Sequence, residues 1–353
     1  MRRRTFVAGA LTAGFVLRAG RVGATGGLDV PLSTPTTMPL NSGMLRVLLG
    51  SGQATGVDAR TFSYNGKLYR GSFSSSQVNN RQAVINTLPL EEYLYSVVPL
   101  ESPASWPAAT LQAQAIVART FALRRMNQNR AYDVVGSERD QAYGGIRAEF
   151  PASTAAVNGT LGVVVRFNNA LASVSYMSCC GGHTEDAANI WGAGLPYLRG
   201  ASDPYCTASP DYHWMREIPW PMFLNAFGSR FDGIGDVRAI NVGPTDSSGR
   251  AKQISLDGAS GSIEIPGLEF RRALGPEVVR SLLIHSAKLN FVVGDQVDAG
   301  PLPPATVTLS GSGRGHGVGL CQWGACGMGR AGRSTRDILS FYFPGTDIGP
   351  AYS

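Results

Sequence analysis

The sequence has few charges and lacks several features that would assign it to a familiar class. Only 16% of its 353 residues are charged, and no dense lysine and arginine run occurs after the first residues. The net charge of +6 therefore indicates a solvated basic surface rather than a nucleic-acid-binding tract. Beyond the amino-terminal region, no apolar stretch is long enough to cross a membrane. No internal repeat stands out.

The amino terminus has the pattern of an export signal. Arg3-Arg4-Thr5-Phe6 fits a twin-arginine signal, and the apolar stretch 6–17 that follows is short for a membrane span. We therefore expect a signal over 1–24 and a linker over 25–43. The protein is expected to be exported, either periplasmic or associated with the cell wall. The alternative is an uncleaved signal, which would be its only membrane contact.

The remaining chain predicts an α+β fold. The 43% hydrophobic content can fill a large core, and 44 glycines and 21 prolines indicate many loops. A buried strand is expected at 44–50, a hairpin turn at Asn65-Gly66 and another strand at 83–90. Strand patterns return at 159–167 and 171–178.

The clearest helix pattern covers 107–126, on which we expect the mixed strands to pack. Pro107 suits the first helical turn, and Ser105 is a candidate cap. Further along, two short helices are predicted at 220–228 and 273–284, and a strand at 304–313. The chain then closes with a glycine-rich loop, two helical stretches and a Pro-Gly turn.

The five cysteines are an odd number, so at least one thiol is left over if the others pair. A disulfide between Cys180 and Cys206 is one candidate in an oxidising compartment. Zinc held by thiols of Cys179, Cys180 and Cys206 with the imidazole of His183 or His213 is another, although adjacent cysteines cannot easily share one ion. Free thiols, or a Cys180 nucleophile paired with His183, are the remaining alternatives.

The stretch "VVPLESPASWP" places one acid, Glu101, in a rigid and mostly apolar segment. Three prolines in eleven residues argue against the middle of a helix and predict a fixed loop. Glu101 is either a helix-entry or surface carboxylate or a general acid. In the second case its apolar surroundings would raise its pKa, so that the carboxyl is protonated near neutral pH.

The glycine-rich string "GRGHGVG" begins at Gly313 and invites comparison with phosphate-binding loops. No Lys-Ser/Thr pair follows, and no strand–helix context frames it. A tight turn that exposes His316 is the better interpretation, with glycines that let the backbone approach a large ligand.

Three segments together resemble the SpoIID/LytB family, the stage II sporulation protein D and amidase-enhancer proteins. They are "LPLEEYLYSVVPLESPASWPAATLQAQAIVARTFAL", "YMSCCGGHTEDAANIWGAGLPYLRG" and "GRGHGVGLCQWGACGMGRAGRSTRDILSFYFPGTDI". The resemblance implies a SpoIID-like catalytic domain over 44–348, with 210–310 as an inserted subdomain.

The resemblance further implies a peptidoglycan lytic transglycosylase that cleaves MurNAc–GlcNAc bonds, preferably in strands stripped of stem peptides. Glu101 occupies the position of the family's catalytic acid. One carboxylate suffices because the sugar's own hydroxyl is the nucleophile. Trp106 is expected to pack below the acid. Candidate substrate-binding residues, each with a structural role as the alternative, are Arg119, Ser178, His183, His316 and Gln322.

The sequence also departs from the family pattern. In place of the zinc ligands of some sporulation members, "VGSERDQAYGG" has Val135, Arg139 and Asp140, so that zinc site is expected to be absent and no cofactor is predicted. Gln112 stands where lysine is common. A role in sporulation does not follow.

Glycan strands are the expected partners, a cell-wall amidase is a further candidate, and no nucleic acid is expected. Two alternatives to the transglycosylase remain. The first is a non-catalytic peptidoglycan-binding amidase enhancer, and the second is a secreted cysteine hydrolase that uses Cys180 and His183.

Overall fold

A computed structural model describes residues 43–231, 233–291 and 303–351. The predicted signal over 1–24 lies outside these ranges, as does the predicted linker except for Gly43. Within the described ranges, no helix has the length and apolar content that a membrane crossing requires. Helices and strands both contribute extensively, which confirms the predicted α+β class.

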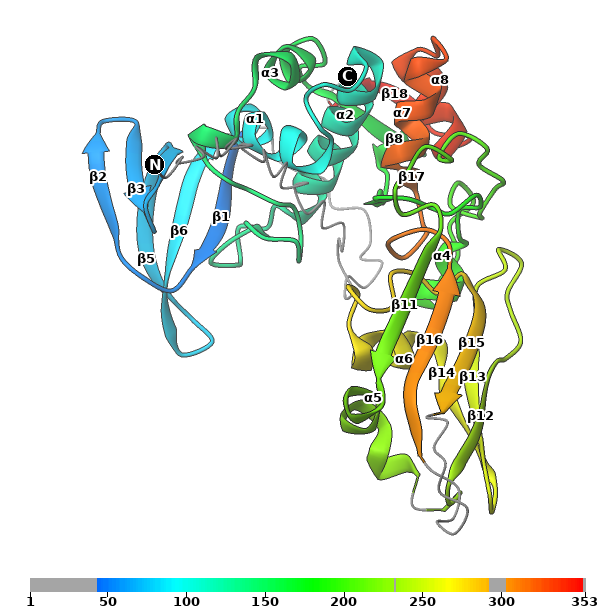
Figure 1. The fold of residues 1–353 in the computed structure, drawn as a ribbon. Helices are drawn as coiled ribbons and strands as arrows, with labels where there is room; N and C mark the ends of the chain where they lie inside the picture. Colours follow the sequence, from blue (N-terminus) through cyan, green and yellow to red (C-terminus); the bar gives the residue numbers. More distant parts are fainter. Residues whose placement is uncertain (1–42, 232, 292–302, 352–353) are drawn as a thin grey trace, which may run out of the picture.

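A mixed sheet that is mainly antiparallel opens the described chain (Figure 1). Its order is β5–β6–β1–β7, with strands β1 (Met44–Gly50), β5 (Ser72–Val78), β6 (Arg81–Pro89) and the short parallel β7 (Val134–Val135). The predicted strands at 44–50 and 83–90 are therefore confirmed.

A three-stranded meander lies beside this sheet. It consists of β2 (Ala54–Asp58), β3 (Thr61–Tyr64) and β4 (Lys67–Arg70). The predicted Asn-Gly turn joins β3 to β4, with φ of 48° at Asn65 and 72° at Gly66. Both residue types tolerate this left-handed backbone, which explains the tight hairpin.

A helical layer packs next to the sheet and carries the predicted site segments. Its members are α1 (Leu90–Glu101), α2 (Ala108–Arg125), α3 (Pro151–Asn158), α7 (Gln322–Arg330) and α8 (Thr335–Tyr342). Helix α2 contacts the other four, as expected for a central helix (Figure 1). Pro107 precedes α2, but no side chain caps it, so the proposed Ser105 cap is absent.

Helix α1 corrects the prediction that Glu101 lies in a rigid loop. The helix contains Pro99 and ends at Glu101. Proline in the last turn removes a single backbone hydrogen bond, and the next proline, Pro103, restricts Ser102 to extended backbone. The buried positions of α1 recur with helical spacing, so Glu101 points inward with them.

Several short strands lie between the helices of this layer and pair in two small sheets. One sheet has the order β18–β8–β9, and a parallel pair joins β10 to β17. Their bounds are β8 (Val163–Phe167), β9 (Ala170–Leu171), β10 (Tyr176–Met177), β17 (Leu320–Cys321) and β18 (Asp347–Pro350). The expected strand 159–167 is thus shorter than predicted, and the expected strand 171–178 is divided between the end of β9 and the two-residue β10. Two small helices, η1 (Ile146–Ala148) and α4 (Ala187–Trp191), lie in the connections.

Two further three-stranded sheets, β11–β16–β15 and β12–β13–β14, form the lower part of Figure 1. The elements are β11 (Trp214–Pro219), α5 (Trp220–Phe227), η2 (Gly228–Arg230), β12 (Val237–Val242), β13 (Gln253–Gly258), β14 (Ser262–Pro266), α6 (Gly267–Leu274), β15 (Ile284–Phe291) and β16 (Pro304–Gly311). They enclose their own hydrophobic core. That 210–310 is an insertion in a 44–348 domain stays a prediction.

The helix predicted over 273–284 is wrong, because α6 ends at Leu274. Gly275 has φ of 86° and breaks the helix, and Pro276 follows it. The predicted helix at 220–228 and strand at 304–313 are confirmed as α5 and β16, as are the two C-terminal helices α7 and α8.

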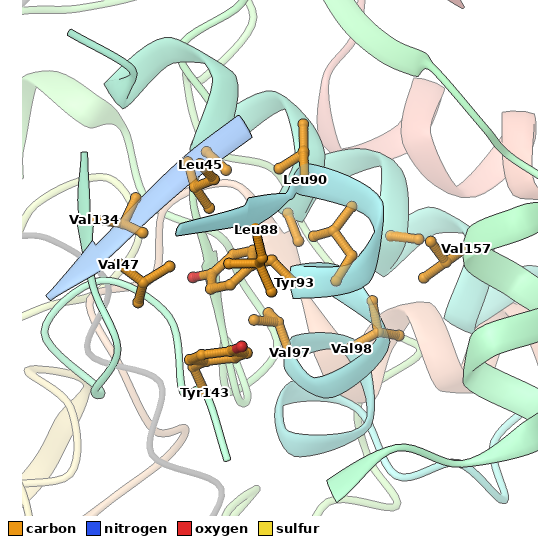
Figure 2. Packing of buried hydrophobic residues seen from close by; sticks show 14 of the residues in the cluster. Leu45, Val47, Leu88, Leu90, Tyr93, Val97, Val98, Val134, Tyr143 and Val157 are labelled. Carbon is orange, nitrogen blue, oxygen red and sulfur yellow. The ribbon is translucent and has the colours of Figure 1, made fainter. Parts of the chain in front are cut away.

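A hydrophobic core between the first sheet and α1 holds the glutamate-bearing helix in place (Figure 2). Leu45 and Leu88 oppose each other across β1 and β6, and both are fully buried. Tyr93, Val97 and Val98 from α1 enter the same cluster. Full burial of each aliphatic side chain stabilises by about 1.5–3 kcal/mol, so this packing fixes the direction of Glu101 one turn later.

Candidate active site

Glu101 is buried, with only 2% of its surface exposed. Its Oε1 accepts a hydrogen bond of 2.9 Å from the Ala142 backbone N–H. Its Oε2 lies 3.4 Å from Nε2 of Gln322 at the start of α7. The carboxyl group therefore joins three segments that are distant in sequence: the end of α1, the loop before Tyr143, and α7.

Burial raises the pKa of Glu101 to about 7, because removal of water disfavours the charged carboxylate. The Ala142, Tyr176 and Gln322 contacts act in the opposite direction and are outweighed. Within the described ranges, no lysine or arginine forms an ion pair with Glu101. Near neutral pH this group can therefore both donate and accept a proton.

Polar atoms without partners surround this carboxyl group. Gln114 Oε1 is 3.5 Å from Gln322 Nε2 and accepts a 3.3 Å bond from the Ser102 hydroxyl. Gln114 Nε2 and Gln322 Oε1 are buried and have no hydrogen-bond partner. The buried Tyr176 hydroxyl lies close enough to Glu101 to lower its pKa but forms no hydrogen bond of regular geometry. Buried polar groups are rarely left unsatisfied, so such a group of atoms is typical of a site that binds a polar ligand.

The sequence interpretation identified Gln322 but missed Ser102, Gln114 and Tyr176. A signal for Gln114 was present, because it is a polar residue among the alanines of α2. Tyr176 carried no such signal, because an aromatic residue in a short apolar strand is ordinary core composition. Its position depends on β10 pairing with β17, which the sequence spacing does not reveal.

Arg119 lies outside this group of polar residues. Its guanidinium forms a bidentate ion pair with Glu91 at 2.7 and 2.8 Å and donates to the carbonyls of Val157 and Val163. It is 1% exposed. Its carboxylate partner is thus Glu91 rather than Glu101, and this geometry favours a structural role over glycan binding.

His316 is half-buried rather than exposed, which corrects the predicted turn. Its Nδ1 accepts from the Val318 N–H at 3.0 Å, its Nε2 has no partner, and its ring lies 5.6 Å from that of Trp191. Burial, together with Arg271 and Arg250, lowers the pKa of His316 to about 3, so the ring is neutral.

The glycines around His316 serve close packing within the chain. Gly317 has φ of 92°, and a Cβ there would lie 2.6 Å from the Arg250 guanidinium. A Cβ at Gly319 would collide with the Ser175 carbonyl. In the described structure these glycines bring the backbone close to the protein's own residues, where the sequence interpretation expected a ligand.

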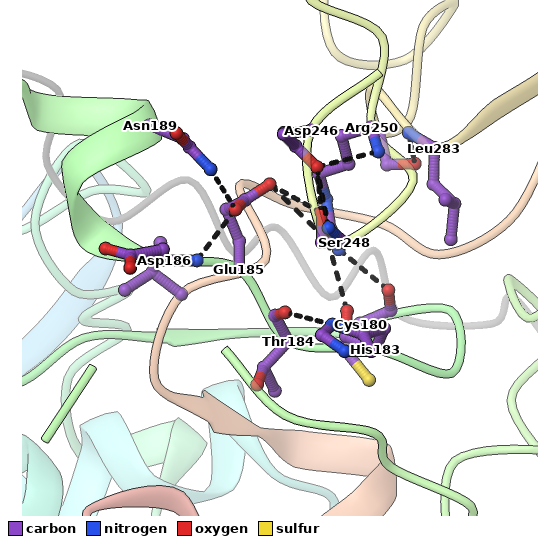
Figure 3. Close-up of polar contacts among 12 residues, drawn as sticks. Cys180, His183, Thr184, Glu185, Asp186, Asn189, Asp246, Ser248, Arg250 and Leu283 are labelled. Atoms are coloured by element: carbon purple, nitrogen blue, oxygen red, sulfur yellow. Dashed lines mark hydrogen bonds and ion pairs between the residues drawn. The ribbon is translucent and has the colours of Figure 1, made fainter. Parts of the chain in front are cut away.

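Arg250 links the lower region to the loop that carries His183 (Figure 3). Its guanidinium donates to the carbonyls of Cys180 and His183 at 2.8 and 3.1 Å. It also lies 3.8 Å from the buried Glu185 carboxylate.

His183 and Ser178 both contact backbone groups of the protein itself. His183 contacts the Thr184 carbonyl through Nδ1. Ser178 is buried, and its carbonyl accepts from the Trp323 N–H. No described contact joins Ser178, His183 or His316 to Glu101, whose only such candidate neighbour is Gln322.

Trp106 packs against Trp323, with ring centroids 4.9 Å apart in an edge-to-face arrangement. It belongs to the same hydrophobic core as α1. Because Trp323 directly follows Gln322, this aromatic pair holds the start of α7 against the segment after Glu101.

The sulfurs of Cys180 and Cys206 lie 3.6 Å apart, and both residues are free thiols in this structure. The predicted zinc set needs correction, because His183 and His213 are bonded to Thr184 and Ser312 instead. The group that converges is Cys180, Asp203, Cys206 and Cys321. Hydrogen bonding with Cys206 raises the pKa of the Cys180 thiol, which argues against a Cys180 nucleophile.

The segment "VGSERDQAYGG", in which the family resemblance predicted the loss of a zinc site, is tied into the fold. Asp140 forms an ion pair with Arg125 at 2.9 Å and accepts from the Val135 N–H at 2.7 Å. Its carboxylate is therefore engaged in holding the loop that supplies the Ala142 N–H to Glu101.

Comparison with known proteins identifies related chains. The model for the SpoIID family, "Stage II sporulation protein", matches residues 78–167. An uncharacterized protein of Brachyspira hyodysenteriae is 32% identical over 290 residues, which cover 81% of this chain and 74% of that protein. Stage II sporulation protein D of Bacillus subtilis is 29% identical over 284 residues, 76% of each chain.

The amidase enhancer of Bacillus subtilis is 27% identical over 303 residues, which cover 72% of this chain but only 40% of that protein. The family match includes Glu101 and all of α1 and α2. The relatives extend the similarity over most of the described chain. This protein therefore belongs to the SpoIID/LytB family.

Proposed function

We propose that this protein is a peptidoglycan lytic transglycosylase in which Glu101 is both general acid and general base. The observation that carries the proposal is a buried carboxyl group with a pKa of about 7 beside two unpartnered polar atoms and the Tyr176 hydroxyl. Family membership supports a cell-wall-acting enzyme.

In the proposed reaction, protonated Glu101 donates its proton to the oxygen that links MurNAc to GlcNAc, and the bond from that oxygen to the MurNAc C1 breaks. The C6 hydroxyl of the same MurNAc then attacks C1, and the Glu101 carboxylate accepts its proton. The products are a 1,6-anhydro-muramic end and a new GlcNAc end, with no water consumed. A single carboxyl group balances both proton transfers, because it is restored at the end.

The Gln322 amide would position Glu101, and the partnerless atoms of Gln114 and Gln322 and the Tyr176 hydroxyl would bind sugar hydroxyl or acetamido groups. The proposal also requires motion, since Glu101 is 2% exposed. A glycan strand must displace the side chains that cover the carboxyl group. In the glycan-free protein these side chains exclude water from Glu101, and the exclusion raises its pKa.

We further propose that the protein acts outside the cytoplasm on glycan strands stripped of stem peptides. A cell-wall amidase that removes those peptides would then be a functional partner, consistent with the amidase enhancer among the relatives. A second candidate function, a non-catalytic amidase enhancer that only binds glycan, is favoured by that same relative and by the burial of Glu101.

Digestion of amidase-treated peptidoglycan tests the proposal. Wild type, Glu101→Gln and the exposed control Glu217→Gln would be compared, with products read by mass spectrometry. We expect anhydro-muramic ends from wild type and the control, and a loss of at least about 100-fold in Glu101→Gln. Reducing ends would contradict the mechanism. Binding by all three proteins without cleavage would support the enhancer function instead.

A further inference from the structure

Three thiols and a carboxylate converge in the interior, apart from Glu101. They belong to Cys180, Asp203, Cys206 and Cys321, all of which are buried, and one ligand atom from each lies within 4.8 Å of the others. The contributing segments are far apart in the sequence and include the loop after β10 and the start of α7. Convergence of this kind is typical of a structural metal site.

The separation between two of the sulfurs is close to the one expected around a single ion. With Zn–S bonds of about 2.3 Å, two sulfurs at tetrahedral positions lie about 3.8 Å apart. The Cys180 and Cys206 sulfurs are 3.6 Å apart, and the Cys180 sulfur is 3.1 Å from Asp203 Oδ2. A disulfide between Cys180 and Cys206 would need a sulfur distance of about 2.05 Å and would not involve Cys321 or Asp203.

The Asp203 carboxylate lacks a counter-charge in the part of the chain that the structure describes. It is fully buried, and no lysine or arginine in these ranges forms an ion pair with it. Burial of an uncompensated carboxylate is strongly unfavourable. A divalent cation among the thiols would supply the missing positive charge.

The surrounding hydrogen bonds hold the four groups as ligands. Cys321 ends β17 and caps the amino terminus of α7, and its sulfur accepts from the backbone N–H groups of Cys180 and Gly324 at 3.2 and 3.3 Å. These two backbone donors orient the Cys321 sulfur toward the other three groups. Asp203 is oriented by the Tyr342 hydroxyl at 2.8 Å and the Tyr205 N–H at 2.9 Å, which is the outer-shell support that metal ligands have.

We propose that Cys180, Asp203, Cys206 and Cys321 form a structural zinc site that fastens the loop after β10 to the amino end of α7. Binding would release the thiol protons to solvent and leave thiolate ligands. This site uses different residues from the zinc cluster of some sporulation members, and it does not depend on cleavage at Glu101.

Metal content of the full chain tests the proposal. The protein would be purified without chelator, incubated with zinc chloride, desalted and measured by mass spectrometry of metals. We expect about one zinc per chain in wild type and in the control Cys326→Ala, which alters a buried thiol outside the site. Cys206→Ser and Asp203→Asn should each bind zinc at least about 10-fold more weakly and so retain less zinc at limiting concentration, because loss of an outer-shell partner alone weakens metal binding by that factor.

Two measurements on wild type keep the test valid if the variants do not fold. Cobalt substitution should give a thiolate-to-metal charge-transfer absorption, and its absence overturns the proposal. Alkylation of denatured, unreduced and chelated protein should modify all five cysteines. Two protected cysteines that become reactive only after reduction would show a disulfide and also overturn it. Neither readout involves glycan, so failure of the zinc site and failure of the transglycosylase are distinguishable.

Discussion

Glu101 and Glu185 are both buried glutamates, but their surroundings differ. Glu185 accepts hydrogen bonds from Ser248, Asn189 and the Asp186 N–H, and Arg250 lies 3.8 Å away (Figure 3). Glu101 has one good hydrogen bond, one long one, and no paired cation in the described ranges. Burial raises the pKa of both carboxyls.

The difference separates a carboxyl group with a structural role from the proposed general acid. The charge of Glu185 is compensated by fixed partners that join the lower region to the His183 loop. Glu101 is held by neutral donors only. Since no cation keeps it ionised, its carboxyl group can gain or lose a proton near neutral pH. A perturbed pKa therefore indicates function only when the partners of the group are also considered.

The largest expected effect comes from removing the cation beside Glu185. Arg250→Met should destabilise the fold by about 3–5 kcal/mol, because it leaves a buried carboxylate without compensation. Urea unfolding followed by circular dichroism measures this. The exposed Arg238→Met should change the free energy of unfolding by less than about 0.5 kcal/mol. Equal effects of the two substitutions would show that the Arg250 pair is not a structural one.

Glu101→Gln should stabilise the fold, in contrast to Arg250→Met, and it should do so only at higher pH. Below a pH of 4.5 the carboxyl is protonated in both folded and unfolded states, so it causes no penalty. As pH rises to about 7, the unfolded chain loses the proton first and the stability of wild type falls. Above that pH the penalty reaches about 3 kcal/mol.

The glutamine variant should therefore be more stable than wild type by about 3 kcal/mol at pH 8 and similar to it at pH 4. The Gln322 amide can turn to accept from the new amide, because its Oε1 has no partner. Paired urea titrations at the two pH values check this. A destabilised variant at pH 8 would mean that the Glu101 carboxyl is not held at a raised pKa.

The smallest effect concerns Gln322, whose contact lowers the pKa of Glu101. Gln322→Ala should raise the pKa of Glu101. In the pH profile of the glycan-cleavage rate, the fall in rate at alkaline pH should then move upward by about half a pH unit, and the maximal rate should be reduced. The exposed Gln77→Ala should leave the pH profile unchanged. A rate loss with no displacement of the limb would assign Gln322 to substrate contact alone.

The sequence by itself was informative where local patterns decide structure. The Asn65-Gly66 turn, the strand 44–50 and the helix α2 follow from backbone preference and side-chain periodicity, which neighbouring residues determine. The three family segments likewise identified the family and singled out Glu101. Local rules failed at Pro99, which lies inside α1, and at Gly275, which ends α6 early.

Only the tertiary structure decided which side chains meet. It paired Arg119 with Glu91, brought Gln114, Tyr176 and Gln322 to Glu101, and placed Asp203 rather than a histidine beside Cys180, Cys206 and Cys321. These contacts join segments separated by tens to hundreds of residues. They depend on how α1, α2, β17 and α7 pack, and packing is a property of whole faces of these elements, which no short stretch of sequence contains.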